Sequence, residues 1–214
     1  MIRKGLYDED KPEELSSGKE NKKSDKDDFE KDSRELTREI DYQFDIEDSV
    51  IYIFDEITEF TTFDFITRAR LILRNRSEEK SNEPINIILN SPGGSVYDMN
   101  GLIDYMNTLS VPVNIIVRGK AMSAAAVILA AATGKRFASK RSTIMFHEPS
   151  SMGIGKQSDL KANVKHIGNM EDDTNKLLGE VTNKPAEWWE KEQKVDLYLN
   201  AQEALDLGVI DEII

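Results

Sequence analysis

INIILNSPGGSVYDMNGLIDYMNTLSVPVNIIV, residues 85–117, is the stretch that predicts the fold class. Its apolar runs at 85–90 and 113–117 are typical of strands that are buried on both faces of a sheet. Residues 95–110 between them carry an apolar stripe at helical spacing, made of Val96, Met99, Leu102, Ile103 and Met106. A strand, a helix and a second strand in this order indicate a right-handed βαβ unit, and hence a parallel sheet.

The alternation of strands and helices continues on both sides of this unit. Strands are predicted at 49–57 and 142–147, and VIDEII (209–214) is predicted as a final edge strand. Helices are predicted at 60–75, 158–182, 185–193 and 200–208, and over the alanine-rich run that Gly134 ends. The expected fold is α/β, with repeated βαβ units that form a mainly parallel sheet flanked by helices.

Residues 1–36 differ from the rest of the chain in composition. Charged residues of both signs are dense there and apolar residues are scarce, so the segment buries too little surface to offset the entropy of ordering it. We expect a disordered charged tail at 1–36 and one domain at 37–214. The tail is interpreted as a solvated extension, with a propeptide or a docking arm as the functional alternatives.

The composition also argues against several classes of function. The formal net charge of −12 repels phosphate backbones, so no nucleic-acid partner is expected. The chain has no window of 18 uninterrupted apolar residues and no apolar signal-peptide core at its start, so we expect no membrane partner and a cytoplasmic location. Since there is no cysteine and the only histidines are His147 and His166, no metal site and no cofactor are predicted.

The segment NSPGG (90–94) joins the first predicted strand to its helix. Its glycines allow a sharp turn and a close approach of the backbone to a ligand, and the helix start that follows is electropositive. Such a turn can bind an anion or an oxyanion, although a plain strand-to-helix turn needs the same residues. The motif is neither a Walker loop nor GxGxxG.

Ser123 in GKAMSAAA (119–126) opens the alanine-rich helix. Three interpretations remain open on its own segment: an N-cap, a small core residue, or a nucleophile whose oxyanion is stabilised by the N–H of Ala124.

His147 ends the strand TIMFH, and ligands of parallel sheets gather at the carboxyl ends of strands, so it is a candidate base. His166 is expected on a helix surface. Asp196 either orients an imidazole or is an ordinary loop aspartate.

These segments, in this order, resemble the Clp protease proteolytic subunit family, serine peptidases of the ClpP/crotonase-like fold. The matching motifs are NSPGGSVYD (90–98), GKAMSAAA (119–126), IMFHEP (144–149) and DLYLNAQEALDLGVIDEII (196–214). The likeness runs from about Val50 to Ile214. One such match would be weak, but four in register with similar spacings are a strong signal.

The resemblance implies that Ser123 is the nucleophile, His147 the general base and Asp196 the residue that orients it. It further implies an oxyanion hole made by the N–H groups of Gly94 and Ala124. The activity would be that of a serine endopeptidase on unfolded or small proteins, inside a homo-oligomer of heptameric rings that stack in pairs. An AAA+ unfoldase would be a further partner, and the helix at 158–182 would protrude to meet the opposite ring.

The chain departs from the family pattern at several positions. Met122 stands where a small residue usually precedes the serine, Arg118 replaces a small or apolar residue, and Glu148 replaces a glutamine. The family's N-terminal segment for contact with the unfoldase is not recognisable. These departures motivate one alternative, an inactive ring-forming homologue. The glycine turn motivates two others, a Ser–Lys peptidase and an acyl-CoA enzyme of the same fold group, because both use a similar turn as an oxyanion hole.

Overall fold

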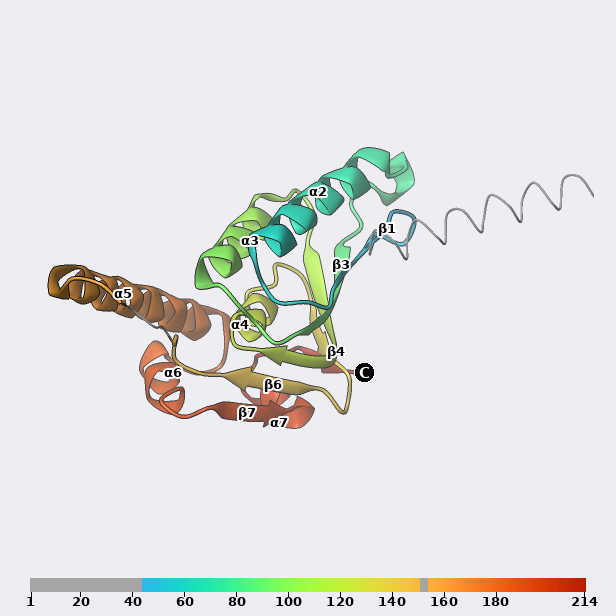
Figure 1. Cartoon of the computed structure of the whole chain (residues 1–214). Coiled ribbons are helices and arrows are strands. Elements are labelled where there is room, and N and C mark those ends of the chain that lie inside the picture. Colours follow the sequence, from blue (N-terminus) through green and yellow to red (C-terminus); the bar gives the residue numbers. More distant parts are fainter. Residues whose placement is uncertain (1–43, 151–153) are drawn as a thin grey trace, which may run out of the picture. The chain divides into compact units, whose positions relative to one another are not determined.

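An eight-stranded sheet organises the residues that the computed structural model describes, 44–150 and 154–214 (Figure 1). Its strands are β1 (Phe44–Asp45), β2 (Val50–Ile53), β3 (Ile85–Ser91), β4 (Val113–Met122), β5 (Arg136–Ala138), β6 (Thr143–Phe146), β7 (Leu197–Asn200) and β8 (Glu212–Ile213). The helices are α2 (Glu59–Asn75), α3 (Val96–Thr108), α4 (Ala124–Ala130), α5 (Gln157–Val181), α6 (Ala186–Glu192) and α7 (Ala201–Asp206), with a 3₁₀ turn at Glu78–Lys80. The tail predicted at 1–36 and its boundary at 37 lie outside the described residues.

The sheet has the strand order β1-β2-β3-β4-β5-β8, with β6 and β7 branching from β4. The pairs β2–β3, β3–β4, β4–β5, β5–β8 and β4–β6 are parallel, whereas β1–β2 and β6–β7 are antiparallel. The prediction of an α/β fold with a mainly parallel sheet is confirmed. The short strands β1, β5 and β7 were not predicted.

β4 is twice as long as its apolar run predicts, because it continues through Gly119 to Met122. Its first half pairs with β5 through residues 115–117, and its last three residues pair with β6. Gly119 has φ 110°, and a Cβ there would lie 2.7 Å from the Asn90 side-chain oxygen. Only glycine therefore lets the strand pass this point and carry its end to β6.

The helix after β4 ends at Ala130, so the prediction that Gly134 ends it is wrong. The Gly134 N–H donates to the Val113 carbonyl at 2.8 Å, and a Cβ on Gly134 would meet that carbonyl at 2.9 Å. The glycine is required for a close approach to β4 rather than for a helix cap. All seven residues of α4 are buried, as expected for a helix that is apolar on every side.

The core lies between the sheet and the row α2–α3–α4, and it extends to Leu178 of α5, Trp189 of α6 and Ala204 of α7. The predicted stripe of α3 is buried at Met99, Leu102, Ile103 and Met106. β3 buries alternate residues completely, while residues between them, such as Ile88, are half-buried. The two-sided burial predicted for this strand is therefore complete on one face only.

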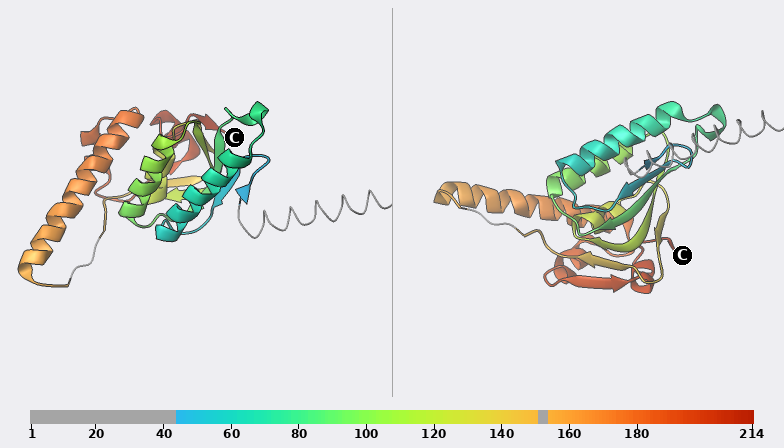
Figure 2. Two further views of the ribbon diagram at one scale, coloured as in Figure 1. Left: turned by 90° about the horizontal axis from the view of Figure 1, so that it is seen from above. Right: turned by 45° about the vertical axis from the view of Figure 1, so that its right-hand side comes forward.

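α5 is the longest helix of the described residues, and its bounds confirm the predicted 158–182 within one residue. Its first turns extend away from the sheet (Figure 2), and among its side chains only those of Asn175 and Leu178 are buried. Its second half contacts α6 and α4. Within residues 44–150 and 154–214, none of the helices combines the length and hydrophobicity that crossing a bilayer requires.

The C-terminal segment is joined to β5 by Asp211 and Arg136. The Asp211 carboxylate accepts from the Arg136 backbone N–H at 2.8 Å and from its Nη2 at 2.6 Å. These hydrogen bonds hold the pKa of Asp211 below its ordinary value. A lowered pKa in the folded state means that the pair stabilises the fold above the pKa of the unfolded chain, about 4.

We predict that Asp211→Asn lowers the free energy of unfolding by about 1 kcal/mol at pH 7, a modest value because Asp211 is partly exposed. The difference from the wild type should shrink as the pH falls below about 4 and vanish below the folded pKa of Asp211. Urea denaturation between pH 7 and pH 3 measures it. Glu212→Gln is the control, and an equal loss in both variants would contradict the assignment.

Candidate active site

Ser123 occupies the turn between β4 and α4 in a backbone conformation that non-glycine residues rarely adopt, with φ 53° and ψ −126°. Its N–H donates to the Met145 carbonyl of β6 at 2.8 Å. Ser123 stands at the N-cap position, yet its side chain makes no capping hydrogen bond with α4. Backbone strain of about 1–3 kcal/mol persists only where the surroundings impose it, and it is common at functional sites.

The Ser123 hydroxyl is directed to His147 instead. His147 Nε2 lies 2.8 Å from Ser123 Oγ, which is hydrogen-bonding distance. The two residues meet because β6 pairs with the last residues of β4, with Met122 opposite Met145, so both follow the carboxyl ends of adjacent parallel strands. The structure thus brings together the serine and the histidine at the edge where the sequence places a site.

Asp196 immediately precedes β7, which pairs with β6. Its Oδ1 lies 3.9 Å from His147 Nδ1, and its side chain is 55% exposed. That distance is too long for a hydrogen bond, so Asp196 is adjacent to the imidazole but does not hold it. His166 is on the surface of α5, as expected, and its Nε2 lies 3.1 Å from the Tyr97 hydroxyl.

The glycine turn after β3 contacts the Ser123 turn. A Cβ on Gly93 would lie 2.7 Å from the Ser123 Cβ and 3.0 Å from the Ala124 nitrogen. The Gly93 carbonyl and the Ser95 N–H both bond Ile57, each at 2.8 Å, as in a parallel ladder. This pairing leaves the N–H of Gly94 on the side away from Ile57.

The N–H of Ala124 belongs to the first residue of α4, where an N–H has no acceptor within its own helix. The two predicted oxyanion donors, Gly94 and Ala124, thus lie in backbone segments that touch at Ser123. Backbone N–H groups are neutral donors of the kind that can stabilise a developing negative charge.

A small cleft adjoins Ser123 and His147. Its lining is mostly apolar or uncharged and comes from α3, α4, α5 and the segments after β6 and α6: Val96, Met99, Ala124, Val127, Phe146, Pro149, Glu171, Thr174, Asn175 and Gln193. Met122 is absent from this lining and pairs with Met145 inside the sheet.

Sequence reasoning missed the contribution of α5 and of Gln193 to this cleft. The buried Gln193 donates to Asn175 Oδ1 at 2.9 Å, and the Gln193 carbonyl accepts from the Glu148 N–H at 3.0 Å. This network joins α5 to the residue after His147. The available signal was Asn175 itself, a polar residue three positions before the apolar Leu178 on one face of the helix.

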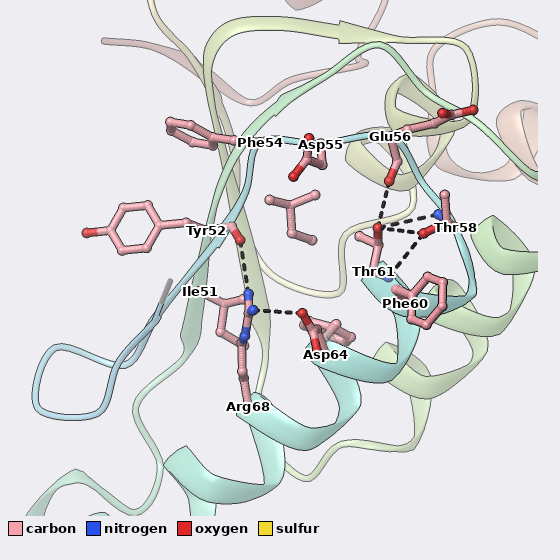
Figure 3. Close-up of a pocket in the computed structure, with 12 residues that line it drawn as sticks. Ile51, Tyr52, Phe54, Asp55, Glu56, Thr58, Phe60, Thr61, Asp64 and Arg68 are labelled. Carbon is pink, nitrogen blue, oxygen red and sulfur yellow. Dashed lines mark hydrogen bonds and ion pairs between the residues drawn. The ribbon is translucent and has the colours of Figure 1, made fainter. Parts of the chain in front are cut away.

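A larger cavity than the cleft beside Ser123 lies elsewhere in the described residues. It has a volume of about 320 Å³ and lies between β2 and the start of α2 (Figure 3). Its lining holds neither a serine nor a histidine, and the hydroxyls of Thr58 and Thr61 are used in the capping box of α2. Of its charged groups, Asp64 and Arg68 pair with each other at 2.8 Å, and Asp55 and Glu56 are exposed. Chemistry, rather than size, therefore identifies the candidate site at Ser123.

Comparisons with known proteins find relatives over most of the chain. A sequence model of the Clp protease family matches residues 34–214. The ATP-dependent Clp protease proteolytic subunit of Porphyromonas gingivalis is 34% identical over 168 residues, which cover 78% of this chain and 74% of that protein. The ATP-dependent Clp protease proteolytic subunit 2 of Frankia casuarinae is 39% identical over 137 residues, 64% of this chain and 63% of that protein. The match thus spans just under two thirds of the second relative.

We predict that Gly93→Ala destabilises the protein by about 2–6 kcal/mol. Its φ of 94° is strained for alanine, and the added Cβ would press on the Ser123 turn. Gly168→Ala is the matched control, because a Cβ there meets no atom within 4 Å on α5; it should raise stability by about 0.4–1 kcal/mol. Thermal and urea unfolding measure both, and a neutral Gly93→Ala would rule out the close contact.

Proposed function

This chain belongs to the Clp protease family and is accordingly a serine protease, and we propose that it is an endopeptidase that uses Ser123, His147 and Asp196. The observation that carries the proposal is the 2.8 Å contact between His147 Nε2 and the oxygen of a strained Ser123 that caps nothing. A serine in that environment has an adjacent base and a fixed direction of attack.

In the proposed reaction, His147 Nε2 takes the proton from Ser123 as Oγ attacks a peptide carbonyl. The carbonyl oxygen becomes an oxyanion, which the N–H groups of Gly94 and Ala124 stabilise. His147 then gives its proton to the leaving amine, and the acyl group stays on Ser123. A water, deprotonated by His147, hydrolyses this ester and restores the enzyme. Asp196 would stabilise the imidazolium from 3.9 Å and more closely if it approaches Nδ1 during the reaction.

The substrate class follows from the size and lining of the cleft. It is small and mostly apolar, and α5 forms one side of it. We propose that it takes one apolar side chain of an extended polypeptide, so that substrates are unfolded or small proteins rather than folded ones.

The proposed assembly is a homo-oligomeric ring, heptameric as the family resemblance implies, with rings stacked in pairs. The first half of α5 supports it, since Val164 is 70% exposed on a helix that extends away from the sheet. An AAA+ unfoldase and a cytoplasmic location belong to the same proposal. The names of the two relatives describe them as ATP-dependent, and this description applies to those proteins.

The alternatives are less well supported. A Ser–Lys peptidase needs a lysine at the serine hydroxyl, but in the described residues His147 is the group placed there. An acyl-CoA enzyme of this fold group needs acidic catalysts, and of the described residues that line the cleft only Glu171 is a carboxylate. An inactive ring-forming homologue is favoured by one observation, the long distance between Asp196 and His147.

The test combines native mass spectrometry with hydrolysis of an unfolded protein by the full chain. We expect a multimer that hydrolyses the substrate and that a fluorophosphonate labels at Ser123. Ser123→Ala and His147→Ala should each lower kcat/KM by at least about 10⁴-fold without loss of the oligomer. Full activity of His147→Ala would instead support a lysine base, and an intact oligomer that neither labels nor hydrolyses would support the inactive homologue.

Asp196 should matter less than His147. Because it is exposed and 3.9 Å from the imidazole, we predict that Asp196→Asn lowers kcat by about 10–100-fold, the effect of losing a negative charge near the imidazolium without a hydrogen bond. Steady-state kinetics of Asp196→Asn and His147→Ala under identical conditions measure this order. A loss in Asp196→Asn equal to that in His147→Ala would mean that the aspartate binds the imidazole tightly in the working enzyme.

A further inference from the structure

One charged side chain lines the cleft beside Ser123. Among the described residues that line it, Glu171 is the only carboxylate, and the others are apolar, uncharged or His147. It lies one turn before Asn175 on the face of α5 that forms the cleft wall, and its side chain is 22% exposed. An unpaired carboxylate at this place would attract a basic side chain into a mostly apolar cleft.

Glu171 is paired with Lys194. Lys194 Nζ lies 3.1 Å from Glu171 Oε1 and 3.0 Å from Glu148 Oε2, so it bridges α5 and the residue that follows His147. These hydrogen bonds, first that of Glu148 and then that of Glu171, raise the pKa of Lys194 above its ordinary value. The ammonium therefore stays charged at neutral pH and cancels one of the two carboxylates.

The other polar groups of the cleft wall already have partners. Thr174 Oγ1 donates to the Met170 carbonyl at 2.9 Å, and Asn175 Oδ1 accepts from Gln193. Glu171, which Lys194 bridges to Glu148, is thus the group of the cleft wall whose charge balance one substitution can change. Surface ion pairs of this kind contribute little to stability, so its substitution should leave the fold intact.

We propose that Lys194 determines the specificity of this cleft by neutralising Glu171, so that the protein accepts an uncharged apolar side chain on the acyl side of the scissile bond and discriminates against a basic one. The proposal rests on the proposed peptidase function. Removal of the ammonium leaves Glu171 and Glu148 without their counter-charge, and the cleft then favours lysine or arginine. Selectivity is a difference between two affinities, and a repulsive charge contributes to it as much as an attractive contact.

The experiment uses the full chain and fluorogenic tripeptide amides that end in leucine or in lysine. In Lys194→Met, the ratio of kcat/KM for the lysine peptide to that for the leucine peptide should rise about fivefold or more over the wild type. Glu171→Gln added to Lys194→Met should return the ratio to the wild-type value. Lys194→Arg should keep the wild-type ratio. Lys191→Met, which removes an exposed lysine that pairs only with Glu192 in the described residues, is the matched control.

A second measurement separates this inference from the proposed function. Binding of fluorescein-labelled tripeptide amides with the same two endings is followed by anisotropy on Ser123→Ala, with and without Lys194→Met. A shift toward the lysine peptide supports the inference even if no variant hydrolyses anything, in which case only the proposed function fails. A ratio that changes less than twofold in folded Lys194→Met protein, or a shift that persists with Glu171→Gln, overturns it.

Discussion

The structure depends on the contact between two backbone turns, the glycine turn after β3 and the Ser123 turn after β4. They approach so closely that a single methyl group on Gly93 would overlap the Ser123 turn. A parallel sheet brings the ends of β3 and β4 to the same edge, but it does not by itself bring the following turns into contact. The glycines at positions 93 and 94 and the pairing with Ile57 hold the two turns in contact and so fix the geometry of the site.

The strain at Ser123 is held in place by its surroundings. Its N–H is bound to the Met145 carbonyl, its own carbonyl accepts from the Ala126 N–H at 2.9 Å, and α4 is buried along its length. Loss of a capping hydrogen bond costs about 1 kcal/mol. The Ser123 hydroxyl is thereby free to bond His147. Serine is common at helix starts as a capping residue, but here its side chain contacts the histidine instead.

The sequence predicted the features that depend on long, strongly patterned segments. The buried strands β3 and β6, the stripe of α3, and the length of α5 follow from hydrophobic periodicity. The motif order pointed to Ser123 and His147, which the fold places at hydrogen-bonding distance.

The features that were missed or wrongly predicted depend on contacts between segments that are distant in the sequence. β5 and β7 have three and four residues, too few to show a period, and they exist because β4 and β6 offer them partners. Gly134 looks like a helix end, but the close approach of β4 is what requires it. The ion bridge of Lys194 joins three segments across the chain, so no local pattern contains it. The 3.9 Å distance of Asp196 is likewise a result of tertiary packing.

α5 connects the site to the surface that the proposed assembly would use. Its second half carries Glu171 and Asn175 into the cleft wall, and its first half carries exposed apolar residues such as Val164. A helix of 25 residues with unbroken hydrogen bonds is stiff. An interface on its exposed half and a substrate in the cleft would therefore both contact the same rigid helix. Hydrogen bonds of Gln193 and Lys194 connect this helix to the segments that contain His147 and Asp196. An interface that fixes α5 would therefore also limit how far the aspartate can move relative to the imidazole. The position of Asp196 therefore depends on the packing of α5 as well as on the loop that contains the residue.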